Sequence, residues 1–538
     1  PPVNVREAFF DWLRARQVTR LFGNPGSTEI PMLVGLPPEV HYVLGLHEAA
    51  VVAMADGYAQ ATGRPAVVSL HAAPGLGNAI GALFTARKNR APLVVLAGQQ
   101  DTRHLLLEPL LAADLVAMAR PAVKWAVEVA EPGGVVEAVE QAWHQAMAPP
   151  PGPAFVSVPS NFWDAPAAPP ALRRVEAGGG PPSGLQALAE ALARAARPAL
   201  VFGAGVARAG PQAVEAAVDL AERLGCDVYA DPIGSRAGFP TDHPLFRGML
   251  LPAAPRLAQA LASYDVVAVF GAPLFLTYPY LPGPLLPPGV QAWLVTDDPA
   301  EAARSAAAVS LVGDVGAALA ELARLLPPPP PGRTLPSRAV EAARARADAA
   351  RARRRMGAAF VLHTLGRLLP DDAVVVDEAI SASPLLRQHV PVRRRGDYFT
   401  AASGGLGWAL PAAVGIKMAW PQRPVVAVVG DGSFHYAPQA LWTAARESVP
   451  VSVVVLDNGG YAILKSYAAA FYPTRADEVP GLDVPAPGIA DVARAWGATA
   501  ERVDDPDSLE QALARVLRPS GGPAVAVVCV DREVPRLF

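Results

Sequence analysis

The chain has 538 residues, of which 51% are apolar, and its formal net charge is −3. This length is enough for three or four domains of ordinary size, and so high an apolar fraction excludes a disordered chain. A net charge so close to zero gives no general attraction to nucleic acid or to an anionic membrane, so we expect neither as a partner.

The cysteines and the N-terminal residues are typical of a cytoplasmic protein. Cys226 and Cys529 stand far apart in apolar, strand-like contexts. This predicts reduced core thiols rather than a disulfide or a zinc site. The first residues show no basic segment followed by an apolar stretch and a cleavage site, and no apolar run approaches the roughly 20 residues that span a bilayer.

Short apolar runs rich in β-branched residues recur along the chain. They are continuously apolar rather than alternating, which is typical of strands buried on both faces of a parallel sheet. Segments with helical spacing lie between them, for example 184–196 and 508–517. The order strand, helix, strand predicts stacked α/β units. The predicted strands are 65–70, 92–98, 154–159, 199–205, 265–271, 292–297, 373–378, 424–431, 451–458 and 524–531.

Two segments rich in proline divide the chain. The first is 166–184, and the second begins with the prolines of 327–331 and continues into an Arg-rich segment. We interpret the arginines as the solvated face of one helix rather than as a nucleic-acid site. The divisions predict three doubly wound α/β domains with parallel sheets, at 1–165, 182–326 and 356–538.

Three polar residues of the first domain stand beside predicted elements. Ser27, in a turn rich in glycine and proline, is typical of a helix cap. Glu48 begins a predicted helix, where the helix dipole alone favours a carboxylate. His71 follows the strand 65–70 and faces its carboxyl edge, where a single histidine is usually structural. In the middle domain, 201–210 contains Gly-x-Gly but lacks the third glycine of a dinucleotide motif, so we expect a structural role there.

The strongest signal lies in the last domain. Asp431, between two glycines, ends a predicted buried strand, and Asn458 ends the next one. Neighbouring parallel strands would place both side chains at one sheet edge, where ligands bind in open α/β sheets. A carboxylate and an amide oxygen form part of a Mg²⁺ site that a diphosphate and water can complete. The alternative is a turn with a loop cap.

Gly-Asp-Gly followed at this distance by asparagine is the signature of thiamine-diphosphate-dependent enzymes, and the chain resembles the benzoylformate decarboxylase branch of that family. The resemblance implies thiamine diphosphate and Mg²⁺ as cofactors. It also implies a pyrimidine-binding, a middle and a diphosphate-binding domain, in that order. The resembling segments are 21–31, 47–66, 75–100, 121–125, 241–250, 402–416, 430–445 and 479–485.

The resemblance assigns roles to residues in the first and last domains. It implies that Glu48 protonates N1′ of the aminopyrimidine, that Ser27 contacts the substrate carboxylate and that His71 transfers protons. The implied metal ligands are Asp431, Asn458 and the carbonyl of Gly460. The implied cofactor-binding residues include Ser381, Ser433 and Tyr436 at the diphosphate, together with Gly432. Gly404 and Leu406 are implied to bind the other half of the cofactor, where a backbone carbonyl group touches the aminopyrimidine and an apolar side chain supports the bent shape of the cofactor. Members of the family pair two chains around each active site, so we expect a homotetramer built as a dimer of dimers.

The substrate end departs from the family pattern. The family's second histidine comes from the middle domain, and its position here falls on Tyr278. A phenol with a pKa near 10 does not replace an imidazole near 6.5 as a proton shuttle at neutral pH. Either Tyr278 only donates a hydrogen bond or His435 takes the role, unless His435 is a supporting or surface residue. The other candidate pocket residues are Thr400, Tyr461, Ile463, Leu464 and Tyr467.

The resemblance therefore predicts an enzyme that decarboxylates a 2-oxo acid to an aldehyde and CO₂. The bulk of Ile463 and the small size of Thr400, relative to the family, predict a changed substrate preference. The alternative is a carboligase or lyase that forms or cleaves 2-hydroxy ketones with the same cofactor. A non-catalytic binding relative is the third possibility, and the presence of Glu48, Asp431 and Asn458 argues against it.

Overall fold

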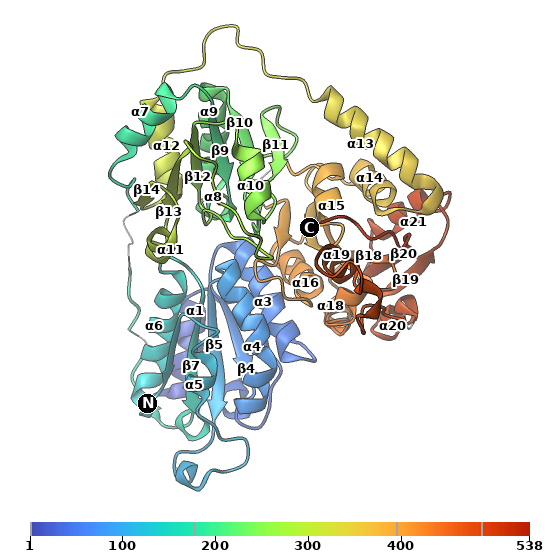
Figure 1. The fold of residues 1–538 in the computed structure, drawn as a ribbon. Coiled ribbons are helices and arrows are strands. Elements are labelled where there is room, and N and C mark those ends of the chain that lie inside the picture. Colours follow the sequence, from blue (N-terminus) through green and yellow to red (C-terminus); the bar gives the residue numbers. More distant parts are fainter. Residues whose placement is uncertain (1–2, 170, 176–178, 394–395, 486–487, 538) are drawn as a thin grey trace.

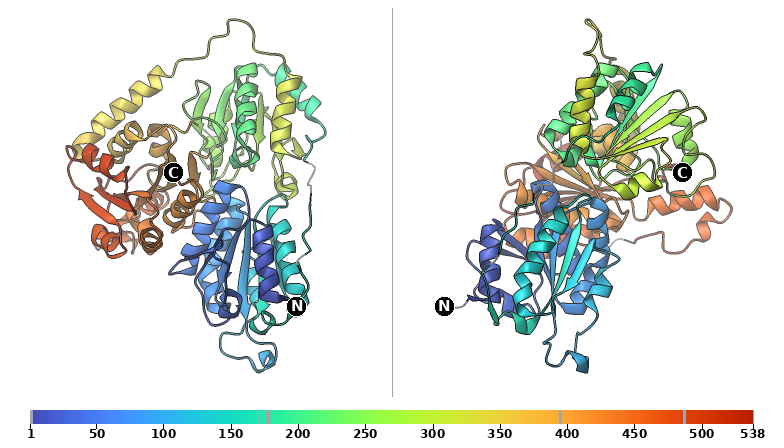
Figure 2. Two further views of the ribbon diagram at one scale, coloured as in Figure 1. Left: turned by 180° about the vertical axis from the view of Figure 1, so that it is seen from behind. Right: turned by 90° about the vertical axis from the view of Figure 1, so that its left-hand side faces the viewer.

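The computed structural model describes residues 3–169, 171–175, 179–393, 396–485 and 488–537 (Figure 1). Within these ranges the chain forms three six-stranded parallel sheets, each covered by helices, and the three domains lie around a common centre (Figures 1 and 2). The predicted fold class is therefore confirmed. Residues 170 and 176–178 of the first predicted linker lie outside the described residues.

The N-terminal sheet has the strand order β3-β2-β4-β5-β7-β6. Consecutive residues of β4 face different cores, because Val67 packs on one side of the sheet and Val68 on the other, and both are fully buried. This is why the run is continuously apolar. The strands are Arg20–Gly23, His41–Leu44, Ala66–Leu70, Leu93–Gln99, Trp125–Glu128 and Pro153–Pro159 (β2 to β7), and the main helices are α1 (Val5–Ala15), α3 (Glu48–Thr62), α4 (Ala72–Asn89), α5 (Leu115–Ala119) and α6 (Val135–Met147).

The middle sheet has the strand order β11-β10-β9-β12-β13-β14, and all of its neighbours are parallel. Its strands are Pro198–Phe202, Asp227–Ala230, Phe246–Met249, Val266–Phe270, Gln291–Thr296 and Val309–Val312 (β9 to β14). Its helices are α7 (Leu185–Arg194), α8 (Ala204–Ala209), α9 (Pro211–Leu224), α10 (Ala254–Leu261), α11 (Pro299–Arg304) and α12 (Val315–Leu325).

The C-terminal sheet has the strand order β16-β15-β17-β18-β20-β19. Its strands are Val374–Glu378, Tyr398–Thr400, Val425–Gly430, Ser452–Asp457, Thr499–Val503 and Ala524–Cys529 (β15 to β20). Its helices are α14 (Ala358–Leu368), α15 (Ser383–His389), α16 (Ala409–Ala419), α17 (Asp431–Phe434), α18 (Ala440–Arg446), α19 (Ala462–Phe471), α20 (Ile489–Ala495) and α21 (Leu509–Val516).

Every strand predicted from an apolar run is present, with small shifts at its ends. The largest shift is at 199–205, where β9 stops at Phe202 and α8 begins at Ala204. Both cysteines are free, but only Cys226 is buried. Cys529 is partly exposed because it is the last residue of β20, so its assignment to the core was wrong.

Helices α3 and α16 join the N-terminal and C-terminal domains through direct backbone contact. A Cβ on Gly57 would lie 2.3 Å from the carbonyl oxygen of Ala412, and one on Gly415 would lie 1.9 Å from that of Met54. Only glycine permits so close an approach at these two positions. One apolar core continues across the contact and includes residues of both sheets. The two helices therefore form a rigid unit.

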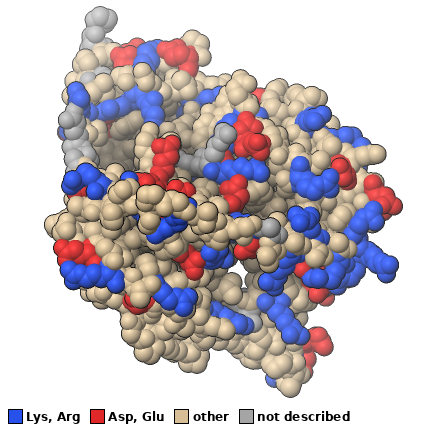
Figure 3. Space-filling view, turned by 90° about the horizontal axis from the view of Figure 1, so that it is seen from above, with Lys and Arg blue, Asp and Glu red and all other residues tan. Residues whose placement is uncertain are grey.

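The Arg-rich segment forms helix α13 (Ala339–Ala352), which runs beside the C-terminal domain (Figure 1). Basic and acidic side chains are interspersed over the face seen from above (Figure 3). Arg351 pairs with Asp348 within the helix, and Arg353 just beyond it contacts Asp507. Among the helices of the described ranges, none combines the length and the apolar character that crossing a bilayer requires.

Candidate functional site

The carboxyl edge of the N-terminal sheet carries Ser27, Glu48 and His71. The strand order β3-β2-β4 places the segments after these strands in one row. Glu48 begins α3, Ser27 lies in the turn after β2, and His71 directly follows β4. Gly75 lies between two of them, since a Cβ there would be 3.2 Å from Glu48 Oε1 and 3.3 Å from His71 Cβ. Ser27 is exposed, whereas Glu48 is only 7% exposed.

His71 is oriented by a glutamate that the sequence did not single out. Its Nδ1 lies 2.8 Å from Oε2 of Glu29, which is buried and also accepts hydrogen bonds from the backbone N–H groups of Gly26 and Gly98. A carboxylate only accepts, so the pair is satisfied when Nδ1 carries the proton. That leaves Nε2 of His71 as the acceptor on the other side of the ring.

Glu48 is held by two amides. Its Oε2 accepts a hydrogen bond from Asn78 Nδ2 at 3.0 Å, and its Oε1 accepts one from Asn24 Nδ2 at 3.4 Å. Neither amide compensates its negative charge. The carboxylate is therefore fixed in place at the sheet edge while it keeps the capacity for a further charged or polar partner.

The carboxyl edge of the C-terminal sheet brings Asp431 and Asn458 together. Strands β17 and β18 are parallel neighbours with Gly430 opposite Leu456. Asp431 directly follows Gly430, and Asn458 directly follows Asp457, the last residue of β18. Asp431 is the first residue of α17 rather than the last residue of a strand. Neither flanking glycine has a positive φ. Gly432 is required for a different reason, because a Cβ there would lie 2.4 Å from the ring of Tyr461.

One oxygen of Asp431 lacks a partner. The residue is 2% exposed, and among the described residues nothing forms a hydrogen bond with its Oδ2. Burial raises the pKa of the carboxyl group, although the backbone N–H groups of Gly432, Gly459 and Gly460 act in the opposite direction. A buried, unpaired carboxylate oxygen is costly unless a cation satisfies it. The donor set of hard oxygens therefore fits a divalent cation.

A small cavity adjoins this edge, and its lining comes wholly from the C-terminal domain. Ser433 contributes a hydroxyl group that donates to the carbonyl oxygen of Glu378 at 3.0 Å. The mixture of hydroxyl groups, glycine backbone and one free carboxylate oxygen fits a diphosphate held through a cation. The lining residues are Glu378, Ala379, Ile380, Ser381, Ala382, Leu406, Gly430, Asp431, Gly432, Ser433, Leu456, Asn458, Gly460, Tyr461 and Ile463.

Two of the six predicted cofactor-binding residues, Gly404 and Tyr436, lie outside the lining of this cavity. Gly404 has φ = 73°, and a Cβ there would meet nothing within 4 Å. Tyr436 is 57% exposed, with its Cβ packed close to Gly407. Asn458 Oδ1 accepts a hydrogen bond from the Gly460 N–H at 3.1 Å.

Helix α19 and the residue before it carry four of the seven predicted substrate-pocket residues. Tyr461 precedes the helix, and Ile463 lies in its first turn; both line the cavity. Leu464 is 46% exposed, and Tyr467 stacks on Phe471 with the ring centroids 4.5 Å apart. These two residues lie outside the lining of the cavity.

The other three pocket candidates are not brought to this cavity within one chain. Thr400 ends β16, and its Oγ1 donates to the carbonyl oxygen of Asp377 at 2.8 Å. Tyr278 is 64% exposed in the middle domain. His435 follows α17, and its buried Nε2 has no hydrogen-bond partner among the described residues.

A loop of the N-terminal domain exposes several leucines. It follows the carboxyl end of β5, on the sheet edge that carries His71, and projects away from the domain (Figure 1). Leu106, Leu107 and Leu110 are 99%, 81% and 84% exposed. Three neighbouring leucines exposed to this extent form an apolar patch, and such a patch marks an interaction surface. In the sequence, the leucines at 105–107 and at 110–111 could have indicated this surface. Their spacing follows neither a helical nor a strand pattern.

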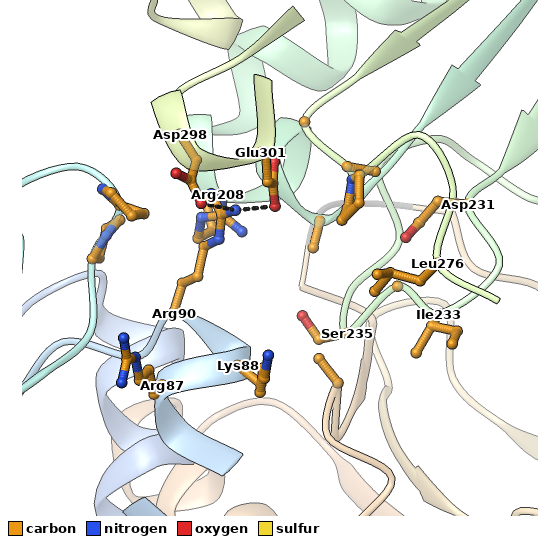
Figure 4. A pocket seen from close by; sticks show the side chains of 18 of the residues that line it. Arg87, Lys88, Arg90, Arg208, Asp231, Ile233, Ser235, Leu276, Asp298 and Glu301 are labelled. Carbon is orange, nitrogen blue, oxygen red and sulfur yellow. Dashed lines mark hydrogen bonds and ion pairs between the residues drawn. The ribbon is translucent and has the colours of Figure 1, made fainter. Parts of the chain in front are cut away.

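A second cavity, of ≈ 670 Å³, lies between the N-terminal and middle domains (Figure 4). Arg90, just after α4, donates to Asp297 at 2.7 Å and to Asp298 at 3.2 Å, and it also contacts Glu301. Arg208 lies 3.6 Å from Asp297. These ion pairs connect the two domains and occupy the carboxylates that follow β13.

The glycines of 201–210 pack strand-end loops against each other. A Cβ on Gly203 would lie 2.3 Å from Cβ of Ala272, and one on Gly205 would lie 2.5 Å from Cα of Gly271. Close packing therefore accounts for both glycines, in line with the structural role expected for this segment.

Comparisons with known proteins relate the chain to one family along its length. The model of the N-terminal TPP binding domain of thiamine pyrophosphate enzymes matches residues 3–118, that of the central domain matches 185–322, and that of the C-terminal TPP binding domain matches 380–528. The chain is 40% identical to a benzoylformate decarboxylase from Pseudomonas aeruginosa, over 95% of this chain and 96% of that protein.

Two further relatives span nearly the whole chain. A solved structure of a thiamine diphosphate-dependent 4-hydroxybenzoylformate decarboxylase from Rhodococcus jostii RHA1 superposes with a TM-score of 0.90 at 37% identity, covering 99% of this chain and 100% of that one. An acetolactate synthase from Arthrospira platensis is 27% identical over 98% of this chain and 94% of its own length.

Proposed function

The chain belongs to the thiamine pyrophosphate enzymes, and on this premise we propose that it decarboxylates a 2-oxo acid to an aldehyde and CO₂ with thiamine diphosphate and Mg²⁺. The match to a benzoylformate decarboxylase, 40% identical over 95% of this chain, carries the proposal. The two polar sheet edges support it, because one carries candidate proton-transfer groups and the other fits a metal with a diphosphate.

The last domain would hold the cofactor. Asp431, Asn458 and the carbonyl oxygen of Gly460 would bind Mg²⁺, and the unpaired Oδ2 of Asp431 supports this assignment. When bound, thiamine diphosphate supplies a carbon nucleophile and accepts the electrons left behind as CO₂ departs. The residues assigned to the cofactor itself are Ser381, Gly404, Leu406, Gly432, Ser433 and Tyr436.

The first domain would handle protons and orient the substrate. Glu48 would give a proton to N1′ of the aminopyrimidine and take it back, and its two amide partners hold the carboxylate for that exchange. The exposed Ser27 would bind the substrate carboxylate. His71 would move a proton at the substrate carbonyl oxygen through Nε2, since Glu29 occupies Nδ1.

These two sets of residues would meet across a pair of chains. The cavity beside Asp431 is lined by the C-terminal domain alone, and Glu48, His71 and Ser27 are absent from that lining. A second chain would bring its own Glu48 edge to this cavity, and the exposed leucines of the β5–α5 loop give it an apolar surface to cover. We propose a dimer with two shared active sites, assembled further into a tetramer.

The substitution Glu29→Gln tests the orientation of His71. We expect kcat to fall about 10²-fold, because the amide no longer selects the tautomer with the proton on Nδ1. Thr28→Val is the matched control, since Thr28 Oγ1 lies 3.3 Å from the same nitrogen and also donates to Glu29 Oε1 at 2.7 Å. Without this hydroxyl group, Glu29 keeps its carboxylate and its two backbone N–H donors. Steady-state kinetics across pH would measure both variants. Equal rates for Glu29→Gln and the wild type, with an unchanged pH profile, would refute the assignment.

The substrate is tested by product analysis with a panel of 2-oxo acids. Ile463 lines the cavity and adds bulk there, so we expect straight-chain or branched 2-oxo acids to compete with benzoylformate as substrates. Aldehyde and CO₂ would be quantified for each acid with added thiamine diphosphate and Mg²⁺. A strong and exclusive preference for benzoylformate would contradict the altered pocket, and no turnover of any 2-oxo acid would contradict decarboxylation itself.

A carboligase or lyase acting on 2-hydroxy ketones is the second candidate. It is favoured by Tyr278 at the position of the missing histidine, because slower protonation would leave time for an acceptor aldehyde to react. The same panel with an added acceptor aldehyde separates the two functions. A 2-hydroxy ketone as the main product would favour the second candidate, and free aldehyde would favour the first.

A further inference from the structure

One buried carboxylate of the N-terminal domain is tied to both ends of segment 402–408 of the C-terminal domain. Asp56 lies on α3, two turns after Glu48, and is fully buried. Its Oδ2 accepts a hydrogen bond from Trp408 Nε1 at 2.8 Å, at the end of the segment. The same oxygen accepts one from Asn89 Nδ2 at 2.8 Å.

Asn89 passes the connection on to the beginning of the segment. Its Oδ1 accepts a hydrogen bond from the backbone N–H of Ala402 at 2.8 Å. Thr85, one turn earlier on α4, lies 2.9 Å from Ser403 between the two hydroxyl oxygens. Helices α3 and α4 therefore hold 402–408 at both ends, and the residues between them include Gly404 and Leu406.

The hydrogen-bond network around Asp56 costs free energy because it keeps a carboxylate buried. This indicates that the network serves the geometry of the segment rather than the stability of the fold. Burial raises the pKa of Asp56 to about 6, although three N–H donors favour its charged form. The third donor is Gln60, 2.7 Å away on the same helix. No cation pairs with Asp56 in the part of the chain that the structure describes. A buried charge without a cation is retained at a cost in free energy.

We propose that Asp56 is a positioning residue that fixes segment 402–408 in the shape that receives the aminopyrimidine half of thiamine diphosphate. The inference rests on the proposed cofactor contacts of Gly404 and Leu406. Asp56 itself touches no cofactor or substrate; it acts through Trp408 and Asn89. The close packing of α3 on α16, which begins directly after Trp408, makes the support rigid.

The test is Asp56→Asn, measured by calorimetric titration of the metal-stripped, cofactor-free protein with thiamine diphosphate in excess Mg²⁺. Asparagine has one acceptor oxygen and no charge, so it either turns its amino group toward Trp408 and Asn89 or holds both donors by weaker, uncharged hydrogen bonds. In either case we expect affinity to fall, by about 10- to 100-fold, as for other supporting partners of a bound group. Gln60→Ala is the matched control, because it removes the one donor to Asp56 that does not lead to the segment. Its affinity should equal that of the wild type.

Inorganic diphosphate with Mg²⁺ is the control ligand for thiamine diphosphate. It lacks the aminopyrimidine, so wild type and Asp56→Asn should bind it equally. An equal loss for both ligands, or no loss for either, would overturn the inference. Trp408→Phe keeps an aromatic side chain but removes the N–H donor together with part of the indole ring, and it decides the matter if Asp56→Asn does not fold. Unchanged affinity for thiamine diphosphate in that variant would also overturn the inference.

These outcomes separate the inference from the proposed function. Wild-type protein that binds thiamine diphosphate but decarboxylates no 2-oxo acid would refute the proposed reaction and leave the role of Asp56 standing if the affinities differ as expected. Wild-type protein that does not bind thiamine diphosphate would overturn both.

Discussion

Replacing Glu48 with glutamine is expected to lower kcat by about 10²- to 10⁴-fold while the fold is retained. Glutamine has nearly the same shape and can still accept a hydrogen bond from Asn78 or Asn24, so the cavity and helix α3 should persist. What it cannot do is exchange a proton with the aminopyrimidine at neutral pH. The loss should therefore fall on turnover rather than on the affinity for thiamine diphosphate.

The control is Glu7→Gln, which changes another glutamate in the first turn of a helix. Glu7 completes a capping box with Asn4 at the start of α1, and glutamine serves there as well as glutamate. If Glu48 only complements the dipole of α3, the two variants should behave alike, with kcat within about 2-fold of wild type. Steady-state kinetics and thermal unfolding of both variants decide whether Glu48 exchanges a proton with the cofactor or only complements the dipole of α3.

Replacing Asp431 with asparagine is expected to have two opposite effects. Affinity for thiamine diphosphate in Mg²⁺ should fall by more than about 100-fold, because a direct metal ligand loses its charge. The metal-free protein should become more stable, by about 1 kcal/mol, because a buried carboxylate oxygen without a partner is replaced by a neutral group. Calorimetric titration and denaturant unfolding measure the two effects.

The opposite signs distinguish a metal ligand from a turn residue. If Asp431 only shaped the turn between β17 and α17, its substitution would lower stability and leave cofactor affinity unchanged. Ser381→Ala provides the comparison, since it alters the same cavity without removing a charge, and we expect only a modest loss of affinity from it.

Most central strands were predictable from their apolar runs, and edge strands were not. Val425–Gly430 and Ser452–Asp457 are buried on both faces and paired on both sides, so their sequences are continuously apolar. Edge strands such as Phe246–Met249 and Thr499–Val503 have one neighbour and partial exposure, and their mixed sequences follow neither template. None of the six edge strands is among the strands predicted from apolar runs, and β2 and β10, interior strands of only four residues each, are also absent from that set.

The residues of the site divide in the same way. Those that stand beside a recognisable strand were predicted, and those whose roles depend on a residue far along the chain were not. Asp431 and Asn458 could be placed together because each follows an apolar strand. Glu29 and Asp56 could not be found, because their roles come from partners far along the chain: His71 lies 42 positions from Glu29, and Trp408 lies 352 positions from Asp56. Only the folded structure reveals such pairs.

The central claim is that this chain decarboxylates 2-oxo acids with thiamine diphosphate and Mg²⁺. It is tested most directly by stripping the protein of metal and cofactor and following CO₂ release from its best 2-oxo acid as each is restored. The account predicts CO₂ release only when both are present, with aldehyde formed in equal amount. Release of CO₂ without thiamine diphosphate, or none from any 2-oxo acid once the cofactor has bound, would contradict it.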